Sequence, residues 1–204
     1  MTKVVWGAVV RLAGATALVL TSASCGDLTR EGTSSSYLII TALEATSGAD
    51  PGTFGGTLSS DVVTVVNSVS TIFADPGRVQ FALGLKDPGP STSPAAPTQN
   101  NFITVDRYRV KYIRSDGRNT EGVDVPYTFD GAFTTTVSGS TTAGFTLVRV
   151  LAKEEAPLRA LGINGIVIST FAEVTFYGHD QTGRAVSVTG QIGISFANFG
   201  DPSS

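Results

Sequence analysis

The chain has 204 residues, of which 17 are acidic and 14 are basic, so its net charge is −3 at pH 7. This mildly acidic balance argues against a nucleic-acid partner, because such proteins carry a basic face. One cysteine and one histidine exclude a disulfide framework and zinc or copper sites of ordinary composition.

The first 25 residues contain the parts of an export signal in their usual order. Lys3 and Arg11 supply positive charge, residues 12–20 form a short apolar run, and small residues occupy positions 21–24. This order is typical of a secretory leader. A membrane-spanning helix over 4–20 is an alternative, but spans need about 20 mostly apolar residues, and Arg11 interrupts this run.

Cys25 follows the small residues directly, and in this the segment resembles the lipobox of bacterial lipoprotein precursors. The resemblance implies that the leader 1–24 is removed and that Cys25 carries a diacylglycerol anchor. The family usually has leucine three positions before the cysteine, where this chain has Ser22. An ordinary secretory cut before Cys25 therefore stays open. Gly26, rather than aspartate, after the cysteine resembles the outer-membrane case of Gram-negative cells.

Removal of the leader leaves 12 basic and 17 acidic residues in the mature chain. Residues 25–36 are polar after the cysteine and are expected to form a flexible tether, with a root-mean-square span of roughly 18 Å. Residues 37–200 are long enough for one domain with a sizeable core.

From Tyr37 onward, short apolar or alternating runs are separated by turn residues, which predicts strands. The expected strands cover 37–44, 61–66, 71–73, 78–85, 102–114, 127–137, 145–152, 166–178 and 185–196. In the last run, apolar residues at 186, 188, 192, 194 and 196 share one parity. The run before it, which starts with Ile166 on its apolar side, alternates in the same way. Asp180 and Gly183 in the short link between the two runs predict a β-hairpin.

The only helical indication is a single turn near 153–161, where Pro157 limits its length. The pattern predicts an all-β fold, an antiparallel β-sandwich of about eight or nine strands. It is immunoglobulin-like by architecture only, because the mature chain lacks the Cys…Trp…Cys core.

Two loops are long, 46–60 and 86–101. Loops above about 12–15 residues are usually functional or disordered. If the strands alternate in direction, both loops emerge at the same end and could form a ligand site. Plain disorder is the alternative, and it is favoured for the proline-rich second loop.

Few residues suggest catalysis. His179 lies beside the hairpin turn, and Asp180, its neighbour in sequence, would point to the opposite face. Glu154, Glu155 and Glu173 are carboxylates without surroundings that would obviously raise their pKa, as a glycosidase would need. The aspartates at 50, 75, 87 and 116 precede Pro-Gly or Gly and are ordinary turn formers, although a structural calcium ion is an alternative.

Arg107, Arg109 and Lys111 share one face of the strand 102–114, opposite Tyr108, Val110 and Tyr112. This row is a candidate interaction face for lipid headgroups or an acidic partner. A solvated sheet face with its aromatic side packed inward is the simpler interpretation.

We therefore expect an exported lipoprotein, anchored through Cys25 in the cell envelope. We expect it to act as a non-catalytic structural or protein-interaction module and to need no cofactor. The first alternative is a glycan or small-ligand binding module that uses the long loops and exposed aromatic residues such as Phe54 or Tyr177. The second is an envelope hydrolase, which would need His179 or carboxylates to converge in a cleft.

Overall fold

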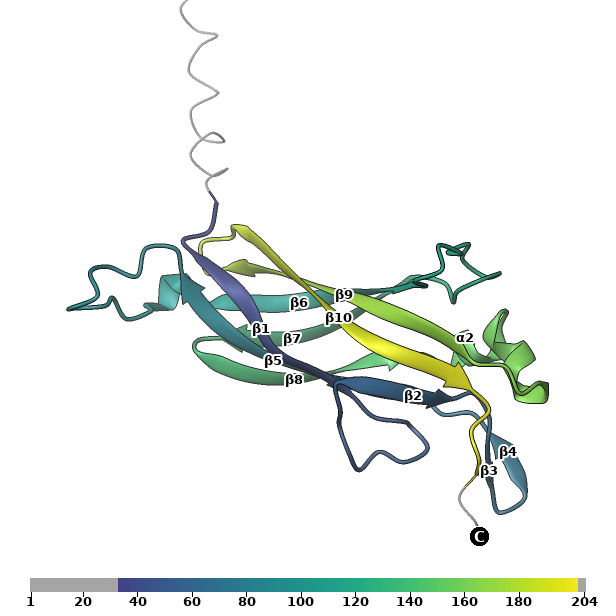
Figure 1. Ribbon diagram of the computed structural model, residues 1–204. Coiled ribbons are helices and arrows are strands. Elements are labelled where there is room, and N and C mark those ends of the chain that lie inside the picture. Colours follow the sequence, from purple (N-terminus) through teal and green to yellow (C-terminus); the bar gives the residue numbers. More distant parts are fainter. Residues whose placement is uncertain (1–32, 202–204) are drawn as a thin grey trace, which may run out of the picture. The chain divides into compact units, whose positions relative to one another are not determined.

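The computed structural model describes residues 33–201, and these form two packed β-sheets and a separate two-stranded hairpin (Figure 1). The strands are Ser36–Ala45 (β1), Thr57–Asp61 (β2), Thr64–Val66 (β3), Val69–Thr71 (β4), Asp75–Leu85 (β5), Ile103–Ile113 (β6), Phe129–Val137 (β7), Ser140–Val148 (β8), Ile168–Asp180 (β9) and Ala185–Ala197 (β10). The predicted all-β antiparallel sandwich is confirmed.

The larger sheet has the order β2-β10-β9-β6-β7. All its neighbours are antiparallel except β2, which pairs in parallel with residues 193–197 of β10. β1 lies beside the first half of β10, where a Cβ added to Gly190 would lie about 3 Å from side-chain atoms of Ile40 and Leu43. β1 and β2 thus run together along one side of β10 but belong to different sheets.

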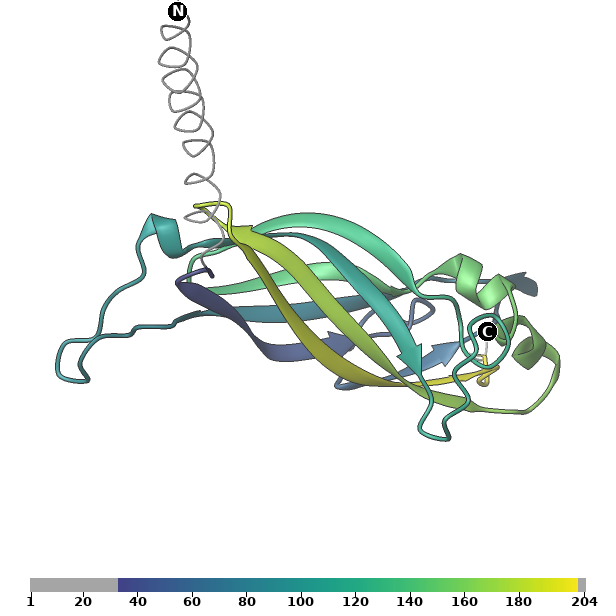
Figure 2. The ribbon, with the colours of Figure 1, turned by 90° about the horizontal axis from the view of Figure 1, so that it is seen from above.

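The smaller sheet has the order β1-β5-β8. The β7–β8 connection, a turn at residues 138–139, takes the chain from the larger sheet to the smaller one (Figure 2). Among the described residues, β7 and β8 each pair with a single strand, so each has one unpaired edge. On β8 the Tyr108 hydroxyl accepts a hydrogen bond from the Thr146 N–H, 3.2 Å away.

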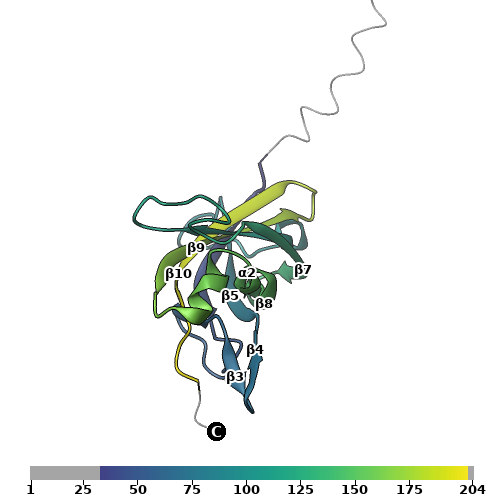
Figure 3. The same ribbon diagram turned by 90° about the vertical axis from the view of Figure 1, so that its right-hand side faces the viewer.

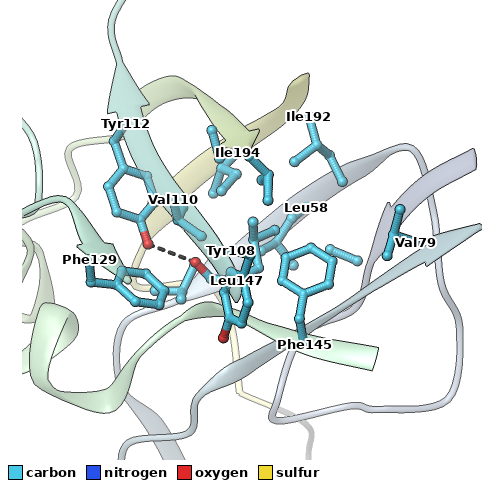
Figure 4. Packing of buried hydrophobic residues seen from close by; sticks show 14 of the residues in the cluster. Leu58, Val79, Tyr108, Val110, Tyr112, Phe129, Phe145, Leu147, Ile192 and Ile194 are labelled. Atoms are coloured by element: carbon cyan, nitrogen blue, oxygen red, sulfur yellow. Dashed lines mark hydrogen bonds between the residues drawn. The ribbon is translucent and has the colours of Figure 1, made fainter. Parts of the chain in front are cut away.

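Aromatic rings fill the space between the sheets (Figure 4). Phe81 of the smaller sheet meets Phe176 of the larger one edge to face at 5.0 Å, a geometry that favours aromatic pairing. The Tyr112 hydroxyl donates to the Leu147 carbonyl at 2.7 Å. The Tyr108 ring lies so close over Gly131, its cross-strand partner, that a Cβ added to Gly131 would clash with the ring.

The predicted hairpin is confirmed as β9–β10, paired from Ile168↔Phe196 to His179↔Ala185. The Gly183 N–H donates to the Asp180 carbonyl at 2.9 Å, and Gly183 has φ +84°. Glycine adopts this left-handed conformation at little steric cost. Alternating burial and turn chemistry therefore agree here.

Several predicted boundaries were wrong: the run 71–73 overlaps β4 only at Thr71, and the loop expected over 46–60 contains most of β2. The strand expected over 145–152 ends at Val148, and the connector holds a short helix, Val150–Glu154 (α2), and a 3₁₀ helix, Leu158–Ile163 (η2), in place of one turn. Ile166 is 58% exposed and precedes β9, which begins at Ile168. The run 61–66 is divided, because β2 ends at Asp61 and β3 opens a separate hairpin with β4.

The expectation that both long loops share one end was also wrong. The loop before β2 follows Ala45, which faces Gly77, whereas the loop after β5 follows Leu85, which faces Ser36. Because β1 and β5 are antiparallel neighbours, the two loops leave this pair at opposite ends. The second loop contains the 3₁₀ helix Gln99–Asn101 (η1) and a turn closed by Ser93 N–H to Pro90 O.

The two ends of the sandwich differ in what they hold. The hairpin end contains the β9–β10 turn and the start of β1. The connector end contains α2, η2 and the 114–128 loop, with the β3–β4 hairpin at its edge (Figure 3). Within residues 33–201, no helix has the length and apolar character needed to cross a membrane.

Candidate functional site

The predicted row of Arg107, Arg109 and Lys111 lies on the exposed face of β6, opposite the buried Tyr108, Val110 and Tyr112. Each cation has a neighbour within the sheet. Arg109 forms two 2.9 Å hydrogen bonds with Asp130, which lower the pKa of that carboxyl.

The Arg107 guanidinium lies 4.4 Å from the Tyr177 ring centroid. Lys111 stands opposite Glu173 in the β6–β9 register. The row is therefore an exposed sheet face on which two of the three cations contact a neighbouring strand.

His179 is exposed, and its Nδ1 lies 3.3 Å from an oxygen of Asp106. The β-bulge between Val105 and Arg107 brings Asp106 to this position, whereas Asp180 is buried. Within residues 33–201, no serine or threonine hydroxyl is hydrogen-bonded to His179. The pair therefore has a base and an orienting acid but lacks the nucleophile that a hydrolytic triad requires.

The predicted carboxylates do not meet in one cleft. Glu154 and Glu155 line a groove at the connector end, while Glu173 lies on the outer face of β9, where it accepts a hydrogen bond from Gln191 at 3.4 Å. Among the described residues, no group of three or more histidine, cysteine, aspartate or glutamate side chains could hold a metal ion.

Three of the four turn aspartates lie apart on the surface, and the fourth is buried. Asp87 accepts the Gly89 N–H at 3.1 Å, as its turn requires. Arg114 and Arg118 hydrogen-bond to Asp116 and lower its pKa. Asp75 is fully buried.

The aromatic residues suggested for glycan stacking are each covered on one face. The Arg78 guanidinium lies 4.3 Å from the Phe54 ring centroid, just as Arg107 covers Tyr177. Phe54 borders a shallow groove over β5 and β8, whereas Tyr177 lies on the outer face of the larger sheet. The two rings thus belong to different surfaces.

An apolar surface at the connector end was not predicted from the sequence. We name it the connector surface, and it consists of Val123, Tyr127, Leu151, Ile163 and Ile166. Ile163 is 94% exposed, Val123 66% and Ile166 58%. Tyr127 and Ile163 line one groove of about 740 Å³ together with Glu154, Glu155 and Arg159. Exposed apolar side chains gathered at one end of a domain are candidates for an interaction site.

A buried ionic cluster next to this surface was also not predicted from the sequence. Lys153 of α2 and Asp75 of β5 are 1% and 0% exposed, and the Lys153 ammonium lies 2.9 Å from both Asp75 oxygens. Ser60 donates to Asp75 at 2.5 Å and the Gly48 N–H at 2.9 Å. Burial raises the pKa of Asp75, and the Lys153 charge counters this rise in part.

The hairpin end holds a second buried carboxylate, Asp180. One of its oxygens accepts hydrogen bonds from the Thr182 N–H at 2.9 Å, the Thr182 hydroxyl at 2.6 Å and the Arg184 N–H at 3.0 Å. Burial alone would raise the pKa of Asp180, but these hydrogen bonds lower it below its usual value. This aspartate fixes the turn.

Cys25 and Gly26 lie outside the described residues, so the predicted anchor stays a prediction. No protein-family model, no curated protein and no solved structure matches this chain.

Proposed function

We propose that this protein is a lipid-anchored, non-catalytic module of the bacterial cell envelope that binds another envelope protein through its connector surface. The leader and Cys25 support the anchor, and Gly26 supports the outer membrane as its place. The connector surface is the single observation that carries the binding role.

The exposed side chains of this surface are aliphatic and aromatic, and burying them in a partner would stabilise a complex by about 25 cal/mol per Å² of apolar area. Its groove carries two carboxylates, Glu154 and Glu155, against one guanidinium, Arg159. Within residues 33–201, Glu154 and Glu155 form no ion pair. The surface therefore fits a protein partner with an apolar centre and a mainly basic edge.

The anchor is tested by metabolic labelling with radioactive palmitate. We expect label in the wild-type chain and none in Cys25→Ala, which should also leave the detergent phase. A mature chain whose first residue is unmodified would contradict the lipid anchor and indicate an ordinary secretory cut.

The binding role is tested by placing a photoreactive side chain at position 163 in cells and, as a control, at position 136 on the outer face of β7. We expect one discrete crosslinked product from position 163 only. In a second series the photoreactive group is placed at position 123. There, Ile163→Asp and the double change Glu154→Lys/Glu155→Lys should each weaken crosslinking to the same partner. Crosslinking that is insensitive to both changes would contradict the proposal.

A further inference from the structure

Lys153 differs from the other lysines of the described residues, Lys86 and Lys111, because its side chain is buried. Its ammonium donates to the Asp61 backbone carbonyl at 2.7 Å and lies 2.9 Å from each oxygen of Asp75. Removing two charges from water costs several kcal/mol per ion. A neutral product formed from this pair would avoid that cost.

The surroundings of Asp75 resemble a site prepared for acyl transfer. One oxygen accepts the Gly48 N–H and the other accepts the Ser60 hydroxyl. Donors directed at both oxygens stabilise the negative charge that develops when a nucleophile adds to a carboxyl carbon. The Asp61 carbonyl holds the amine in place through one of its hydrogens.

Amide formation requires Asp75 as the neutral carboxylic acid and Lys153 as the neutral amine. Burial raises the pKa of Asp75, and the Lys153 ammonium lies within hydrogen-bonding distance of both its oxygens. Transfer of one proton from the ammonium to the carboxylate gives a neutral amine beside a neutral carboxylic acid. The amine is then a nucleophile and the acid an acceptor.

We propose that Lys153 and Asp75 condense into an intramolecular amide. The Lys153 Nζ adds to the Asp75 Cγ, a C–N bond forms, one C–O bond breaks, and the oxygen leaves as water. That water carries the proton transferred to the carboxylate and one further proton from the nitrogen. Ammonium and carboxylate thus become one amide and one water, with no change of oxidation state.

The closeness of the Lys153 amine and the Asp75 carboxyl accelerates their condensation. Well-oriented intramolecular groups react as if at effective molarities of about 10⁵–10⁸ M, and the fold holds these two within hydrogen-bonding distance. The other ion pairs of the described residues do not offer the same chemistry. Arg78–Glu44 and Arg109–Asp130 are partly exposed and use guanidinium groups, which stay protonated in proteins.

The test is peptide mapping of the purified full-length wild-type chain after denaturation and trypsin digestion. An acylated lysine is not cleaved, so we expect residues 31–78 joined to residues 150–159. The joined product should be lighter than the two separate peptides by one water molecule. Cleavage after Lys111 should be complete in the same digest, which controls for digestion.

Lys153→Arg is the matched variant, because it keeps the positive charge but cannot form this amide; its digest should give 31–78, 150–153 and 154–159 as three separate peptides. Recovery of 150–153 and 154–159 as free peptides from folded wild-type protein would overturn the proposal. A water loss mapped to any other residue pair would overturn it too. The result does not depend on the anchor or on the connector surface, so the proposed function stands or falls separately.

Discussion

The two ends of the sandwich each bury an aspartate, and they stabilise it in different ways. At the hairpin end, one oxygen of Asp180 accepts hydrogen bonds from the Thr182 and Arg184 N–H groups and the Thr182 hydroxyl, while its other oxygen is buried without a hydrogen-bond partner among the described residues. At the connector end, Asp75 has two such donors and a buried ammonium. The pKa of Asp180 is lowered, whereas that of Asp75 is raised.

The two directions differ because Asp75 lies deeper: its burial outweighs the Lys153 charge and its hydrogen bonds, whereas hydrogen bonds outweigh the burial of Asp180. Asp180 is part of a turn whose backbone donors lie within four residues, so its bonds are local and need no long side chain. Asp75 depends on groups far along the chain, including Lys153. Four substitutions test this comparison and contrast the buried clusters with the surface, from the largest expected effect on stability to the smallest.

Lys153→Met should cause the largest loss, because it leaves Asp75 buried without its partner. Breaking a buried ion pair from one side typically costs about 3–5 kcal/mol, and loss of the proposed amide would add to this. The free energy of unfolding, measured by urea denaturation, checks this. The double variant Lys153→Met/Asp75→Leu should be more stable than Lys153→Met alone, and a less stable double variant would show that the carboxyl is tolerated without Lys153.

Asp180→Ala should cost about 1–3 kcal/mol, because it removes the acceptor for three donors in the hairpin turn. The folded pKa lies below the usual aspartate value of about 3.9, so this contribution is present above pH 4 and is lost as the pH falls through the folded pKa. The stability gap between wild type and variant should therefore narrow on acidification. If the stability gap widened on acidification, the folded pKa of Asp180 would have to be raised instead of lowered.

Ile163→Ser tests whether the connector surface contributes to the fold. Because this side chain is almost fully exposed, the free energy of unfolding should change by no more than about 0.5 kcal/mol. Thermal denaturation checks this, and Leu161→Ser, which alters a buried neighbour in η2, is the control that should destabilise the chain. A large loss in Ile163→Ser would assign the side chain to packing instead of binding.

Arg109→Ala should have the smallest effect. The Arg109–Asp130 pair is exposed on both sides, and surface pairs of this kind contribute little. The unfolding midpoint should stay unchanged within error at physiological salt. A measurable loss, matched by Asp130→Ala, would mean that a surface pair can rival the buried clusters.

Local patterns predicted much of this fold. The β9–β10 hairpin followed from alternating residues and from Asp180 and Gly183, all within one short stretch. The inward packing of Tyr108, Val110 and Tyr112 followed from parity in the same way. Each of these features depends on neighbours only a few residues apart.

The features that the sequence reading missed depend on distant partners. The Lys153–Asp75 contact joins residues 78 positions apart, and Lys153 taken alone resembles any solvated lysine of a connector. The connector surface was missed because Ile166 fitted the parity of a strand that begins two residues later. Asp106 reaches His179 only through a β-bulge, which leaves no local pattern.

The parallel contact between β2 and β10 dictates the order in which the chain can mature. Among the strands of residues 33–201, β2 pairs with β10 alone, and the carboxylate of Asp61, the last residue of β2, accepts the Phe199 N–H across 138 positions. Long-range pairings of this kind slow folding. A ribosome must therefore release nearly the whole polypeptide before β2 can join its sheet, and until then residues 57–61 are open to chaperones and proteases.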